Sequence, residues 1–240
     1  MTVNELTKKQ EEMIVRIKQN AENKGLSKKN PILNPIYDGV ADIAGYVLLK
    51  PKIMWILKEP YDDFTPAGKP KGGDWSLMDI DFRYGISNMH KVMMQISYAI
   101  HNNLDWKKLD YIDDNPDMIT SLKQCAYINI SKMPAETTSS DTHLWDCYPK
   151  WKDIILEQIK LYNPDIIIFG NTFMYLRNDL NITENDKPIY TVSGKWCSGT
   201  YQKDGVIFID AYHPARKGGE DGSHDYVTSI VNAVKKVLNK

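Results

Sequence analysis

Four short apolar runs constrain the fold of this chain more than any other feature. Each is apolar at consecutive positions rather than at alternate ones, which is typical of strands buried on both faces. Longer polar or amphipathic segments separate the runs, and strands that alternate with helices indicate a parallel sheet covered on both sides. The sequence therefore predicts an α/β fold, a three-layer α/β/α sandwich with a central, mainly parallel four-stranded sheet. The runs are KIMWIL (52–57), CAYINI (125–130), DIIIFG (165–170) and VIFIDA (206–211).

Amphipathic segments between and around these runs predict the helices. The first carries a narrow apolar stripe that includes Leu6, Met13 and Ile17, and the last has Ser223 as its candidate N-cap. A chain of 240 residues is long enough for one substantial core, so we expect a single domain. In it, an N-terminal helix within 1–30 packs on a core formed by 31–240. The helical segments are 5–24, 76–102 (in most of its length), 149–162 and 223–239.

The composition is that of a globular protein, with 42% hydrophobic and 25% charged residues. No apolar run approaches the roughly 20 residues that span a bilayer, and we expect a cytoplasmic protein. The formal charge of −1 does not indicate a polyanionic partner, so any nucleic-acid binding must depend on a local site. The widely spaced Cys125, Cys147 and Cys197 form neither a metal knuckle nor an even disulfide set. We expect free thiols, Cys125 in the core and no bound metal.

Polar residues follow the apolar runs at the positions where a parallel sheet binds ligands. Ligands of open α/β sheets occupy the crevice beyond the carboxyl ends of the strands. Glu59 follows the first run, Asn129 lies near the end of the second and His213 follows the fourth. A carboxylate, a carboxamide and an imidazole are therefore expected to converge on one edge of the sheet.

Each of these residues has a structural interpretation beside the functional one. Glu59 either ends a strand where it meets water or orients a water molecule and stabilises a developing cation. The Asn129 amide is either tied to a neighbouring loop or left free to read the edge of a ligand. His213 is either a structural histidine or a neutral donor to a developing oxyanion. The remaining histidines have no matching partner in the sequence and are assigned no chemistry: His90, His101, His143 and His224.

In their order along the chain, these strand ends resemble the motifs of the uracil-DNA glycosylase superfamily. LKEPYD resembles the first motif, G-Q-D-P-Y-H, with Glu59 in place of Asp and with Pro60 and Tyr61 identical. YINISKMP places an Asn where the second strand of the family ends in one. PKWKDIILEQIKLYNPDIIIFGN resembles the helix and third strand of the thermophilic and related branches, and HPA resembles the final H-P-S motif. The resemblance runs from about residue 50 to the C-terminus.

Some positions depart from the family pattern. Lys58 replaces a Gln whose neighbourhood helps to hold uracil, and the Glu59 carboxylate reaches one methylene further than that of Asp. Ala215 replaces a Ser that contacts a DNA phosphate in the family. The iron-sulfur branches use four cysteines, whereas this chain has three without the spacing, so neither a cluster nor another cofactor is expected.

The resemblance implies a DNA repair hydrolase that flips uracil or a related damaged base out of DNA and cleaves its N-glycosidic bond. Glu59 and His213 would be the catalytic pair, the first by positioning water and the second by donating to the base. Asn129 would select the base. The aromatic residue that stacks on it is left open, with Phe82 among the candidates. The implied substrate-binding set is Asn129, Lys58, Pro60, Tyr61, Phe64 and Trp75.

Contacts to DNA are expected from two glycine-rich loops, TPAGKPKGG with Lys69 and Lys71 and HPARKGG with Arg216 and Lys217. The same loops are equally compatible with a solvated surface. Two other functions stay open: a non-catalytic nucleic-acid or nucleotide-binding module on the same fold, and a hydrolase of another N-glycoside. We expect a monomer whose partner is single- or double-stranded DNA with a damaged base, and no membrane partner.

Overall fold

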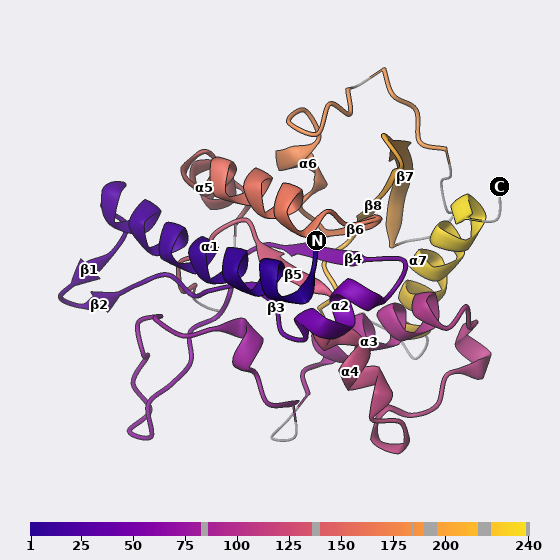
Figure 1. Ribbon diagram of the computed structural model, residues 1–240, viewed down its shortest axis with the longest axis horizontal. Coiled ribbons are helices and arrows are strands. Elements are labelled where there is room, and N and C mark those ends of the chain that lie inside the picture. Colours follow the sequence, from indigo (N-terminus) through magenta and orange to yellow (C-terminus); the bar gives the residue numbers. More distant parts are fainter. Residues whose placement is uncertain (83–85, 136–139, 184, 190–195, 216–221, 239–240) are drawn as a thin grey trace.

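A mixed sheet forms the centre of the computed structural model, which describes residues 1–82, 86–135, 140–183, 185–189, 196–215 and 222–238. Within them the main sheet has six strands in the order β3-β5-β4-β6-β8-β7 (Figure 1). The four inner strands are parallel, and β3 and β7 lie antiparallel at the two edges. The predicted α/β fold is confirmed, but the prediction of four strands omitted both edges. The strands are β3 (Gly39–Val40), β4 (Ile53–Leu57), β5 (Ala126–Asn129), β6 (Ile166–Gly170), β7 (Cys197–Lys203) and β8 (Val206–Ala211), with a separate hairpin of β1 (Lys28–Lys29) and β2 (Ile32–Leu33).

Helices cover both faces of the sheet, as the doubly apolar strands require. Alternate residues of each inner strand enter two separate hydrophobic clusters. One cluster lies under α3, α4 and α7, and the other lies under α1, α5 and α6 (Figure 1). β4 and β6 are buried at every position, which explains why their sequences have no polar face. The helices are α1 (Val3–Asn23), α2 (Ile43–Leu48), α3 (Asn88–His101), α4 (Asp117–Lys123), α5 (Asp141–Tyr162), α6 (Phe173–Leu176) and α7 (Gly222–Leu238).

Several local predictions differ from the structure. The helix predicted at 149–162 begins eight residues earlier, at Asp141, with Ser140 as its N-cap, and Pro149 lies inside it. Helix α7 begins at Gly222, so Ser223 lies in its first turn and is not its N-cap. Within 76–102, the α-helix covers only the second half. Cys125 is buried as expected, and all three cysteines are free thiols. Among the described residues, no helix is long and apolar enough to cross a membrane.

Candidate functional site

The carboxyl ends of the four parallel strands lie along one edge of the sheet. Leu57 at the end of β4 pairs with Asn129 at the end of β5, and Gly170 at the end of β6 pairs with Ala211 at the end of β8. The end of β5 with Asn129, the end of β4 and the end of β8 therefore lie along the same edge, with β6 between β4 and β8.

Glu59 follows β4 on a turn that is fixed by its neighbours. The backbone N–H of Ser131 donates to the Lys58 carbonyl at 3.0 Å, and the N–H of Ala135 donates to the Pro60 carbonyl at 2.9 Å. The Glu59 side chain is only 4% exposed, and its Oε2 lies 3.2 Å from Nε2 of His143. Glu59 is therefore not a strand end that meets water, because its carboxylate is enclosed and already has a partner.

His143 is a residue that the sequence did not single out, and the expectation that it has no partner is wrong. It lies one turn before Cys147 on α5, and the Cys147 Sγ is 3.3 Å from the same Nε2 that faces Glu59. Burial raises the pKa of the Cys147 thiol, so this sulfur stays protonated at neutral pH. Among the described residues, no group of three or more His, Cys, Asp or Glu side chains is arranged to hold a metal ion. One signal in the sequence could have placed His143 in the first turn of a helix. Ser140, three residues before it, is a typical N-cap residue, and its hydroxyl accepts the His143 backbone N–H.

Asn129 carries the most unusual side chain of this edge. It is 1% exposed, and its backbone N–H donates to Oδ2 of Asp38 at 2.8 Å. Its Nδ2 and Oδ1 are both buried without a hydrogen-bond partner. An unpaired buried amide is costly in free energy, and a bound ligand is one of the groups that could satisfy it. Of the two interpretations of Asn129, the free amide is the one observed.

A buried ion pair holds the backbone beside Asn129. Asp38 accepts hydrogen bonds from Lys132 Nζ at 2.7 and 2.9 Å, and Lys132 also donates to Gln158 Oε1 at 2.8 Å. Gln158 Nε2 in turn donates to Asp38 at 2.8 Å. Neither charged side chain is exposed, and burial lowers the pKa of Lys132 while Asp38 opposes that effect. Because Asp38 also binds the Asn129 N–H, the pair fixes the register of the strand end.

His213 lies half-buried in the turn after β8. Its Nδ1 accepts a hydrogen bond from the Ala215 N–H at 3.2 Å, which assigns the proton of the neutral imidazole to Nε2. This is the tautomer that the predicted donor role needs. Gly170 lets the turn pack on β6, because a Cβ at that position would lie 3.0 Å from Pro214 Cδ.

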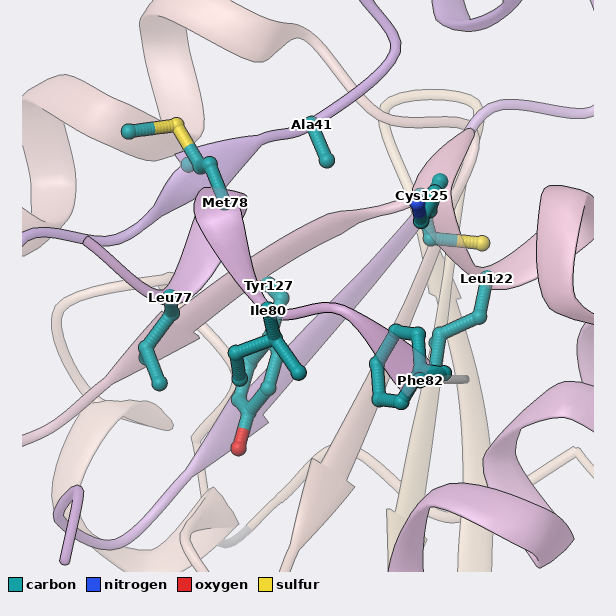
Figure 2. Close-up of a pocket in the computed structure, with 10 residues that line it drawn as sticks. Ala41, Leu77, Met78, Ile80, Phe82, Leu122, Cys125 and Tyr127 are labelled. Atoms are coloured by element: carbon teal, nitrogen blue, oxygen red, sulfur yellow. The ribbon is translucent and has the colours of Figure 1, made fainter. Parts of the chain in front are cut away.

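The aromatic candidates for stacking on a base differ in their surroundings. Tyr61 and Phe64 are 61% and 60% exposed, and Trp75 donates through its indole N–H to Asp62 at 3.4 Å. Phe82 is buried and lines a small cavity of about 20 Å³ with Tyr127 (Figure 2). Figure 2 shows Phe82 with Leu122 and Cys125 on one side of this cavity, across from Tyr127 and Ile80. Phe82 is therefore the aromatic candidate with a cavity beside it.

The predicted cationic residues are partly neutralised. Lys58 lies 3.3 Å from Asp141, and Lys71 pairs with Asp63 at 2.5 Å. Lys69 is exposed in the same loop as Lys71. The predictions for Arg216 and Lys217 fall outside the described residues. The basic character of this edge is therefore weaker than a count of lysines indicates.

Comparisons with models of known protein families and with curated proteins find no match to this chain. The chemistry of the site must therefore be judged from its own residues.

Proposed function

We propose that this protein is a DNA repair glycosylase on a uracil-DNA glycosylase-like fold, which cleaves the N-glycosidic bond of uracil or a related base after base flipping. The observation that carries the proposal is the Asn129 amide, which is buried and has no hydrogen-bond partner. Asn129 pairs with Leu57 at the end of β4, two residues before Glu59. A primary amide matches a base edge that has a carbonyl oxygen beside a ring N–H, because it donates to the first and accepts from the second.

Cleavage of an N-glycosidic bond has a transition state with cationic sugar and anionic base. The Glu59 carboxylate supplies the negative charge and orients water through Oε1, while His143 holds Oε2. His213 donates from Nε2 to the oxygen of the departing base. Both groups are fixed before the substrate arrives, so little reorganisation opposes the reaction.

The test is incubation of the protein with single- and double-stranded oligonucleotides that carry one uracil, followed by alkaline cleavage at abasic sites. Loss of one preorganised group costs about 2.7–4 kcal/mol of barrier, so Glu59→Gln and His213→Ala are each expected to lower the cleavage rate at least ~100-fold. Glu22→Gln, on the exposed end of α1, is the matched control and should cleave like the wild type. Full activity in Glu59→Gln or His213→Ala would refute the assigned mechanism.

A non-catalytic nucleic-acid-binding module on the same fold is the second candidate. The contact between Glu59 and His143 favours it, because the carboxylate oxygen that faces the imidazole is occupied and cannot also hold a water molecule in the same place. Binding of the uracil oligonucleotide without any cleavage would support this candidate over the enzyme.

A further inference from the structure

A second buried polar group without a partner lies on the same side of the sheet as Asn129. It is Nε2 of His90, in the first turn of α3. The other ring nitrogen, Nδ1, lies 3.0 Å from the Ser87 hydroxyl. That hydroxyl also accepts the His90 backbone N–H at 3.2 Å. We assign the hydroxyl proton to the contact with Nδ1, which leaves the ring proton on Nε2 as an unused donor.

The direction of α3 places His90 at the edge that holds Asn129. Near the amino end of β4, His101 Nε2 lies 3.1 Å from the Pro51 carbonyl, and in mid-strand Trp55 donates to Ser97 at 3.3 Å. Helix α3 therefore runs opposite to the strands. His90 precedes Ser97 by seven residues, or about 10 Å of helix, toward the carboxyl edge.

Tyr127 links His90 to Asn129. Its ring centroid is 6.2 Å from that of His90. Asn129 is two residues further along β5, so it projects from the same face about 6.6 Å beyond Tyr127, toward the carboxyl edge. The two unpaired groups therefore lie on the same face of the sheet, toward its carboxyl edge.

Phe82 completes the surroundings of His90. The two rings meet edge to face at 5.0 Å, and Phe82 also lines the small cavity beside Tyr127. This cavity has room for about one water molecule, and its lining includes neither His90 nor Asn129. Burial lowers the pKa of His90 to about 4, so the imidazole is neutral at physiological pH.

We propose that His90 is a specificity-determining residue that reads the ligand together with Asn129. Its Nε2–H donates to one ring carbonyl oxygen, while Asn129 donates to the other and accepts from the ring N–H between them. The ligand class is therefore a base with an imide edge, in which two carbonyl oxygens flank an N–H. Cytosine is rejected because it has an amino group in place of one of these oxygens, and that group meets a donor. The inference rests on the proposed function and names its substrate class.

The test measures binding of two oligonucleotides that differ only in one base, uracil or cytosine, by fluorescence anisotropy. A 2′-fluoro sugar at that position slows cleavage, so that binding is observed alone. His90→Phe keeps a ring against Phe82 and Tyr127 but removes the donor, and His90→Gln keeps an N–H donor. We expect His90→Phe to weaken binding of the uracil oligonucleotide about 10- to 100-fold without weakening binding of the cytosine oligonucleotide, so that the preference for uracil narrows. His90→Gln should stay within about 5-fold of the wild type.

The possible failures are distinguishable. Equal binding of uracil by the wild type and His90→Phe overturns the role of His90 and leaves the glycosylase proposal intact. Equal binding of uracil and cytosine by the wild type overturns both. If His90→Phe does not fold, the Nε2–H proton resonance of the wild type decides: it should shift when the uracil oligonucleotide is added, and its failure to shift overturns the inference.

Discussion

At the scale of single residues, some buried polar side chains have a hydrogen-bond or ion-pair partner and others have none. Glu59 has His143 as a partner, whereas Asn129 and His90 keep buried atoms without one. Unpaired buried groups reduce stability, so their retention at Asn129 and His90 is consistent with a binding role. Among the aromatic candidates, Phe82 is buried and lies in contact with His90, whereas Tyr61 and Phe64 are exposed.

Asp210 on β8 gives a prediction that does not depend on the proposed function. Its carboxylate lines a cleft of about 270 Å³ together with Arg177 and Tyr201, and burial raises its pKa to about 6 while Arg177 partly opposes this. Because the pKa is higher in the folded chain than in the unfolded chain, the folded state binds the proton more tightly. The stabilisation from this proton is complete below about pH 4 and is lost as the pH rises through 6.

Asp210→Asn should remove this loss. The stability that the wild type loses between pH 4 and 8 through deprotonation of Asp210 is at most about 3 kcal/mol, which corresponds to a shift of roughly two pKa units. Urea unfolding at several pH values measures it: the wild type should lose stability relative to Asp210→Asn as the pH rises from 5 to 7. Asp153→Asn, which changes an exposed carboxylate of α5, is the control and should follow the wild type. Parallel curves for Asp210→Asn and the wild type would contradict the prediction.

At the scale of elements, the buried pair of Lys132 and Asp38 joins the loop after β5 to the segment before β3, and Gln158 joins both to α5. Lys132→Met leaves the Asp38 carboxylate buried without its cation. We expect a loss of about 3–5 kcal/mol in the free energy of unfolding, measured by urea denaturation at pH 7.

The surface pair of Lys50 and Asp165 provides the comparison for this prediction. Its atoms are 2.9 Å apart, but the side chains are 65% and 38% exposed. Lys50→Met should cost no more than about 1 kcal/mol. Equal costs for Lys50→Met and Lys132→Met would show that burial does not govern the strength of the pair around Asp38.

The sequence predicts the inner strands well and the edges poorly, for a physical reason. Strands buried on both faces need continuous apolar runs, and these are visible in the sequence. Strand β3 has only two residues, and β7 (CSGTYQK) mixes polar residues with a glycine and a register irregularity, so neither carries such a signal. The start of α5 was missed because Pro149 is typical of a first turn, whereas here it lies within the helix.

At the scale of the whole molecule, strand order could be used to predict which backbone ends meet, but not which side chains pair. Glu59, Asn129 and His213 lie on one edge because parallel strands place their carboxyl ends together. The contacts of His143 and His90 depend instead on how α5 and α3 pack across the two faces, and no local pattern determines that. The sequence thus predicts where the residues at the strand ends lie, but not the contacts that the helix-borne histidines make.

Gly170 tests whether the site depends on close packing among three strand ends. A Cβ at this position would lie 2.4 Å from Leu57 Cδ2 and 3.0 Å from Pro214 Cδ, so Gly170→Ala must displace the end of β4 or the turn that carries His213. We expect a loss of about 1–3 kcal/mol in stability by urea denaturation. Cleavage should fall by up to about 100-fold, since a misplacement of ~1 Å is enough for that loss.

A double-mutant cycle with Leu57→Val identifies the cause. Valine lacks the Cδ2 atom that the new Cβ would meet, so Gly170→Ala should cost less stability in the Leu57→Val background than in the wild type. The contact with Pro214 remains in both backgrounds, so cleavage should recover only in part. Additive losses would place the strain elsewhere than between β4 and β6. A smaller loss in the Leu57→Val background would instead show that the absence of a side chain at the end of β6 is what lets the segments bearing Glu59 and His213 approach each other.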